Sequence, residues 1–347
     1  MALAMPRPVR AGRLGSDVIA LFPKEIGEFA YADLKTARHL PWFAQFKDQV
    51  VPSRFRQFER FLAAAGIDPD SQVDELAWAT VMPSGQIVKA TETTKEDAPA
   101  KAAPGKDQKP AVASAPPASA PQTGEQIVGI ALGNFSPSSA EKYFEQQKLP
   151  IVKIRGYSLF AFGTGTGPTD IFFFFIDSNT AAFGHRQLLE KLIEVRFGGE
   201  ESLLRNDRLF PLVDEVNGHG LVWAVMDENY TRLGINQLLP EAAQFPDAGK
   251  LFARVKAMTI EVLADRGVDA RMNAVCGSTD DANTLAQLLQ AGLLYRRYQE
   301  AQSNPDLAKA IDSSTVTARG DRLQVGFALT DDLLVALLRR NTFAVKM

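Results

Sequence analysis

The chain has 347 residues, of which 46% are hydrophobic and 23% charged, a composition typical of a globular protein long enough for two domains or one large duplicated domain. Its net charge of −3 provides no basic footprint for nucleic acid or for an anionic membrane. The single cysteine, Cys276, excludes an intrachain disulfide framework and a cysteine-based zinc site. No window approaches the roughly 18 apolar residues of a membrane-spanning helix, so no membrane span is predicted.

The N-terminal residues, 1–16, are predicted to form a disordered tail. Ala2-Leu3-Ala4 has the small-x-small pattern of a signal-peptidase site, but no apolar segment precedes it. Two interpretations stay open: an export signal upstream of Met1, or a plain basic tail. The first favours the periplasm or cell envelope, and the second the cytoplasm.

A first unit of strands and helices is predicted for residues 17–216. It opens with a strand at 29–34. Two amphipathic helices follow, with apolar residues at three- and four-residue spacing: Trp42, Phe43 and Phe46 in the first, and Phe55, Phe58, Leu62 and Ala65 in the second. A further strand is expected at 73–82.

The composition changes within this unit, at residues 84–124. No aromatic residue occurs between Ala79 and Asn134, and 98–121 consists largely of Ala, Pro and Lys. Such a segment cannot bury enough apolar surface to offset the entropy of ordering it. We therefore predict a disordered insertion, which lengthens a loop at a small entropic cost.

Order is expected to resume at Gln126 with an apolar strand. Ser136 and Pro137 are typical of a helix start, because serine accepts a free amide hydrogen and proline has none to leave unpaired. Further strands are predicted at 151–155, 157–162 and 170–176, followed by a short return strand and an amphipathic helix.

The strand at 170–176 holds the candidate site. Its four consecutive phenylalanines, Phe172, Phe173, Phe174 and Phe175, place two rings on each face, so the strand is expected inside the sheet and covered on both sides. Together with Phe160 and Phe162 they would line an apolar pocket for a lipid-like ligand. More often such a cluster is simply core.

The second part of the chain, 217–347, repeats this order of elements. A strand at 221–226 is followed by helices, a hairpin turning at 265–267, a long leucine-patterned helix, a second hairpin turning at Gly320-Asp321, and a last helix. The predicted fold class is therefore α+β, with two tandem copies of an antiparallel sheet that has helices packed on one face, and the disordered insertion in the first copy.

Two stretches carry a family resemblance. One is the Phe-x-Tyr-x-Asp-Leu strand at 29–34, after Pro23. The other is the Ile-Asp-x-Asn-Thr turn with the Ala-Phe-Gly strand and helix at 176–192. Together they resemble an uncharacterised family of bacterial envelope-associated proteins, exported or membrane-anchored and built as two α+β repeats. The resemblance implies an envelope location and no known activity.

Other motifs favour structural roles. The glycine-rich stretch 163–168 lacks the Gly-Lys-Ser/Thr ending of a phosphate loop and precedes a strand, so it predicts a hairpin loop. His39, His185 and His219 are far apart and have no local ligand partners. The triplets Thr279-Asp280-Asp281 and Thr330-Asp331-Asp332 are typical of capped helix starts, and Cys276 of a buried strand position.

Functionally, the sequence favours a non-enzymatic, envelope-associated structural or interaction protein. The alternative is a carrier for an apolar, lipid-like ligand, and a hydrolase without a recognisable motif ranks third. No catalytic residue, metal site or cofactor is indicated. The expected partner is an unidentified protein or an apolar ligand, and not nucleic acid.

Overall fold

The computed structural model describes residues 12–50, 53–82, 125–238, 252–265 and 267–342. The predicted insertion at 84–124 and residues 1–11 of the predicted tail lie outside these described residues.

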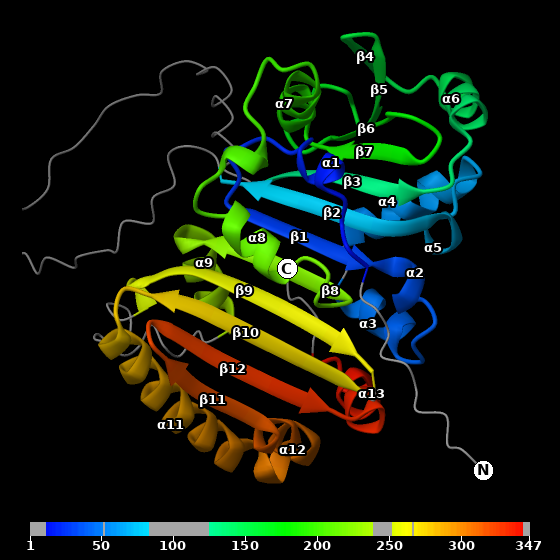
Figure 1. Cartoon of the computed structure of the whole chain (residues 1–347). Coiled ribbons are helices and arrows are strands. Elements are labelled where there is room, and N and C mark those ends of the chain that lie inside the picture. The colour runs from blue at the N-terminus through cyan, green and yellow to red at the C-terminus, as the bar shows by residue number, and fades with distance from the viewer. Residues whose placement is uncertain (1–11, 51–52, 83–124, 239–251, 266, 343–347) are drawn as a thin grey trace, which may run out of the picture.

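The described residues form an α+β fold around a single antiparallel sheet, which confirms the predicted class. Within the described ranges the sheet has 12 strands, in the order β11-β12-β10-β9-β8-β1-β2-β3-β7-β6-β5-β4 (Figure 1). The strands are β1 (Glu28–Asp33), β2 (Val73–Val81), β3 (Gln126–Gly133), β4 (Ile151–Ile154), β5 (Tyr157–Phe162), β6 (Ile171–Phe175), β7 (Thr180–Gly184), β8 (Val222–Asp227), β9 (Val255–Ala264), β10 (Val268–Cys276), β11 (Ser314–Arg319) and β12 (Arg322–Leu329).

The first strand of each predicted unit joins the two halves of the sheet. β1 pairs antiparallel with β8, and Tyr31 lies opposite Trp223. Their rings stack with centroids 5.5 Å apart, and both side chains are fully buried. The two predicted sheets are therefore one continuous sheet, because the backbone groups of the two first strands satisfy each other.

On the two sides of this central pair, corresponding strands follow one another in the same order. On one side it is β1-β2-β3-β7-β6, and on the other β8-β9-β10-β12-β11, while the β4–β5 hairpin occurs on the first side alone among the described strands. The tandem duplication, which is inferred from the order of elements in the sequence, stays a prediction.

Helices cover both faces of the first half. One face carries α1, α7 and α8 over a core that includes Phe172 and Phe174, and the opposite face carries α4 and α6 over a core that includes Phe173 and Phe175. The sequence predicts helices on one face of this sheet. In the first half this is wrong, because the side chains of β6 point to both faces and all of them are buried. The helices of this half are α1 (Ser16–Ile19), α2 (Leu34–Ala37), α3 (Phe43–Val50), α4 (Ser53–Ala64), α5 (Pro69–Gln72), α6 (Pro137–Gln146), α7 (Arg186–Arg196) and α8 (Phe210–Val216).

Among the described helices, those of the C-terminal part pack on one face of the outer strands of the second half, as expected. Val316 and Val325 pack against Leu285 of α11 in one core, and Leu334 and Leu338 of α13 pack with Trp42 in another. On the opposite face, Figure 1 shows no described helix over β12 and β11, while α8 borders this face, where its Glu215 pairs with Arg322 of β12. The helices are α9 (Glu228–Leu238), α11 (Thr279–Ser303), α12 (Pro305–Asp312) and α13 (Asp331–Arg339). No helix in the described ranges is both long and apolar enough to cross a membrane.

The end of the predicted tail is ordered. Leu14 is buried, and the side chain of Asn217 holds its backbone from both sides: Leu14 N donates to Oδ1 at 2.9 Å, and Nδ2 donates to Leu14 O at 3.0 Å. Residues 12–16 therefore belong to the folded chain, which corrects the predicted boundary at 16. Burial of the Leu14 side chain supplies the reason, since it joins the core beside Val18 and Ile19.

Candidate functional site

The aromatic cluster predicted as a ligand site lies inside the two cores of the first half. Phe160, Phe172, Phe173, Phe174 and Phe175 are buried, and Phe162 is half-buried beside them.

Around Phe173 the space is filled by other rings. Its centroid lies 4.8 Å from that of Phe144, 5.4 Å from Phe58 and 6.0 Å from Phe160. Offset and edge-on ring pairs at these separations are typical of a packed aromatic core. The contacts therefore favour core over pocket, and the carrier stays a prediction.

The glycine-rich loop 163–168 donates hydrogen bonds to the carboxylate of Asp170, which follows it in the chain. Oδ2 of Asp170 accepts hydrogen bonds from the Gly165 amide at 2.7 Å, the Gly167 amide at 2.9 Å and the Thr164 hydroxyl at 3.0 Å. A phosphate would need these same amides. The loop therefore binds an internal anion and serves as the hairpin connection that the sequence predicts.

Burial of Asp170 by itself would raise the pKa of its carboxyl group. The hydrogen bonds from Gly167, Thr164 and Gly165 outweigh that effect and hold the pKa below its usual value. Gly163 adopts φ +143°, and a Cβ there would lie 2.0 Å from Asp170 Oδ1. The glycine is needed for the close approach of the carboxylate.

The remaining motif residues have structural roles. Cys276 is buried, and burial raises the pKa of its thiol, as expected of an inert core cysteine. His185 is the N-cap residue of α7, and its Nδ1 accepts the Ile127 amide at 2.9 Å. No group of three or more potential metal ligands occurs among the described residues.

The two Thr-Asp-Asp triplets differ in their caps. Thr330 caps α13 as predicted, because its hydroxyl accepts the Leu333 amide. At the other triplet the cap is Ser278, one residue earlier, whose hydroxyl accepts the Asp281 amide at 3.1 Å. The carboxylate of Asp281 accepts a hydrogen bond from Arg254 at 2.5 Å, and this bond holds the pKa of Asp281 below its usual value.

A polar surface that the sequence did not single out lies on the side of β10, β12 and β11 opposite α11. We call it the open face; it consists of Arg271 and Asn273 of β10, Gln324 and Arg322 of β12, and Thr315 and Thr317 of β11. The strand register places Asn273 opposite Gln324, and Gln324 opposite Thr317. Alternation along the strands puts these side chains on the face opposite the α11 core.

The centre of the open face carries side-chain donors and acceptors that are not used within the described part of the chain. Among the residues that the structure describes, the side chains of Asn273, Gln324 and Thr317 find no hydrogen-bond partner. Two flanking cations are paired: Arg322 binds Glu215 bidentately at 2.8 and 3.0 Å, and Arg271 binds Asp269 at 2.6 Å. Arg319 of β11, opposite Arg322, has no carboxylate partner among the described residues. A neutral row of amides and a hydroxyl is thus bordered by charges of both signs.

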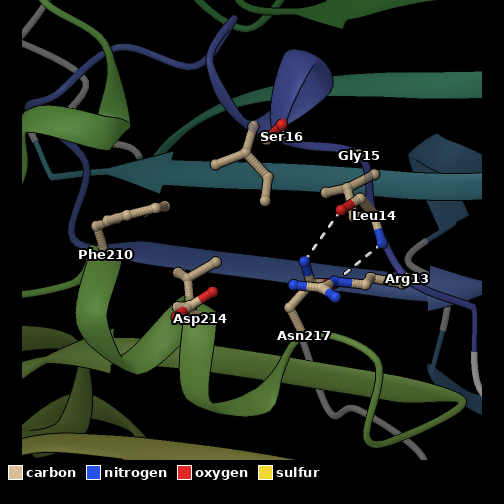
Figure 2. Close-up of a pocket in the computed structure, with 9 residues that line it drawn as sticks. Arg13, Leu14, Gly15, Ser16, Phe210, Asp214 and Asn217 are labelled. Atoms are coloured by element: carbon tan, nitrogen blue, oxygen red, sulfur yellow. Dashed lines mark hydrogen bonds between the residues drawn. The ribbon is translucent and has the colours of Figure 1, made fainter.

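A pocket lies between the N-terminal segment and α8. It has a volume of about 220 Å³, and Figure 2 shows the Asn217 amide bonded to the Leu14 backbone at its edge. Ile19, Phe210 and Val213 form its apolar part, while Arg13, Ser16 and Asp214 are exposed at its rim. No local sequence pattern indicates this pocket, because its two sides, which meet at Leu14 and Asn217, lie 203 residues apart in the chain.

Comparisons with known proteins bear on the fold. No protein-family model matches the chain, and a search of curated proteins finds no match. The chain is similar to a solved structure titled crystal form III of TP0453, with a TM-score of 0.50, 8% identity, and coverage of 94% of this chain and 99% of that chain. Crystal form I of TP0453 gives a TM-score of 0.49, 10% identity, and coverage of 96% and 100%. At such low identity the likeness concerns the fold alone.

Proposed function

We propose that the protein is a non-enzymatic interaction protein that binds a protein partner through the open face. The observation that carries the proposal is the row Asn273, Gln324 and Thr317, whose side chains have no hydrogen-bond partner among the described residues. Such groups gain partners at an interface without first breaking bonds within the chain.

The charges on this face favour a protein over a polyanion. Arg271 and Arg322 are each neutralised by a carboxylate of the same chain, and Arg319 beside Arg322 is a single cation without a partner among the described residues, too few for a row of phosphates. A partner with mixed polar groups matches both the amides and the alternating charges. The proposed location is the cell envelope, and its support is the family resemblance of 29–34 and 176–192.

The test is the size of the native complex. The paired variant Asn273→Lys, Gln324→Lys places two cations at the centre of the open face, while Gln302→Lys adds one at an exposed position of α11. In gel filtration of a gentle lysate of the source organism, wild type and Gln302→Lys should elute in a complex and the paired variant as a monomer. Wild type eluting as a monomer, or together with the paired variant, would contradict the proposal.

Cell fractionation tests the location separately. The protein is expected with the envelope fraction. Recovery in the cytosolic fraction alone would contradict the envelope proposal and leave the open face untouched.

A further inference from the structure

The pocket between the N-terminal segment and α8 has a charge pattern unlike its surroundings. Arg13 and Asp214 both line it, and in the described part of the chain neither side chain forms an ion pair or a side-chain hydrogen bond. Neighbouring Glu215, by contrast, is fully engaged with Arg322. One free cation and one free anion therefore face the same space.

The rest of the pocket is apolar. Ile19 and Val213 are buried, and Phe210 adds an aromatic wall. The volume of about 220 Å³ lies below the roughly 300–1,000 Å³ of pockets for drug-sized ligands, so the pocket suits a smaller molecule.

The walls are held in place from both sides. Asn217, at the C-terminal end of α8, fixes the backbone of Leu14, so that Arg13 and Asp214 are presented from two segments locked to each other (Figure 2). Such preorganisation reduces the entropic cost of binding.

We propose that this pocket binds a free α-amino acid with an aliphatic side chain. Asp214 accepts hydrogen bonds from the ammonium group, Arg13 donates to the carboxylate, and the side chain packs against Ile19, Val213 and Phe210. A carboxylate and a guanidinium are the complementary partners for the two ends of a zwitterion, and charge-assisted bonds of this kind are the strong ones. The pocket is formed by the N-terminal segment, α1 and α8, whereas the open face lies on β10, β12 and β11, so this proposal does not rest on the open face.

The experiment titrates the full-length protein with L-leucine and follows backbone amide shifts by NMR. Shifts are expected for residues 13–19 and 210–217 at millimolar ligand. Three analogues dissect the contacts: 4-methylpentanoate lacks the ammonium group, L-leucinamide lacks the carboxylate, and glycine lacks the side chain. Each should bind more weakly than leucine.

Variants assign the two charges. Asp214→Asn and Arg13→Gln should each weaken leucine binding about tenfold or more, the loss of one charged hydrogen bond. The matched control Glu215→Gln removes the adjacent carboxylate of α8, which faces Arg322, and should bind leucine as wild type does. Unchanged melting temperatures for the Arg13 and Asp214 variants show that both remain folded. No shifts with millimolar leucine, or equal binding by wild type and Asp214→Asn, would overturn the proposal.

Discussion

Phe172 and Phe173 are adjacent in the chain, yet their rings belong to different hydrophobic cores. Phe172 packs in the core beneath α1, α7 and α8, and Phe173 in the core beneath α4 and α6. The period of two along a strand produces this separation. β6 thus ties together the two helical layers of the first half, and the fold depends on it from both sides.

Phe172→Ala and Phe173→Ala should each lower the free energy of unfolding by about 3–5 kcal/mol, because burial is lost and a cavity remains. Chemical denaturation measures the change. Phe197→Ala serves as the control, because Phe197 is 52% exposed, and it should cost much less. If either core variant kept wild-type stability but lost a co-purified lipid, the carrier would become the better interpretation.

Asp170→Asn should destabilise the protein by about 1.5–3 kcal/mol at neutral pH, since the amide cannot replace a carboxylate that accepts three hydrogen bonds. The folded-state pKa of Asp170 lies below its ordinary value. Its contribution to stability is therefore complete above the unfolded pKa and is lost as the pH falls through the folded pKa. Denaturation of wild type and variant across acidic pH measures the difference.

The control for Asp170 is Asp177→Asn in the turn that follows the same strand. Asp177 accepts a single bond, from the Asn179 amide at 2.8 Å, which asparagine can also accept. A difference between wild type and Asp170→Asn that stayed constant down to the acid limit would contradict the assigned role of the carboxylate.

At neutral pH, Glu28→Gln should raise the stability of the protein, whereas Asp170→Asn lowers it. Burial raises the pKa of Glu28, and the hydrogen bond from the Thr80 hydroxyl, 2.7 Å long, opposes this only in part. A raised folded-state pKa means that ionised Glu28 costs stability once the pH exceeds that pKa. Glutamine keeps the acceptor without the charge, so the variant should be more stable than wild type at pH 7, and the gain should vanish towards about pH 4.

Thermal melting at several pH values measures this gain, with exposed Glu200→Gln as the control that should change little. A Glu28→Gln variant that melts below wild type at pH 7 would contradict the prediction, because the ionised Glu28 carboxylate would then stabilise the folded protein.

Asn217→Ala should release the N-terminal segment. The variant loses both hydrogen bonds to the Leu14 backbone, at a cost of about 1–3 kcal/mol. Hydrogen exchange at the Leu14 amide and tryptic cleavage after Arg13 should both become faster. Asn273→Ala removes an asparagine whose side chain has no hydrogen-bond partner in the described ranges, and it should leave cleavage after Arg13 unchanged. Equal cleavage rates for wild type and Asn217→Ala would contradict the role of this clamp.

Local sequence patterns predicted much of the fold. The alternation in β9, β10 and β12 predicted the hairpin and its buried face, and Phe172 to Phe175 predicted a strand covered on both sides. These features follow from side-chain periodicity, which a sequence displays directly. The triplet at 279–281 predicts a cap at Thr279, whereas the structure has it at Ser278, because both residues are capable caps and only the backbone geometry decides between them.

Features that depend on distant segments were not predictable. The joining of two sheets into one rests on backbone bonds between β1 and β8, which carry no side-chain signature. Asn217 looked like a turn residue, although its side chain binds Leu14, 203 positions away. The open face could not be predicted for a similar reason. Polar residues on strands are expected wherever a face of the sheet meets water, and only the arrangement of the helices shows which face that is.

The open face is proposed to be the surface that meets a protein partner, and site-specific photo-crosslinking in the source organism probes that contact residue by residue. A photoreactive residue would replace Thr317 or, separately, Thr315 on the open face, and Lys309 on α12 as the exposed control. Thr317 and Thr315 should yield the same discrete crosslinked product, Lys309 none, and Asn273→Lys with Gln324→Lys should abolish it. No product at Thr317 and Thr315, or the same product at Lys309, would contradict the claim.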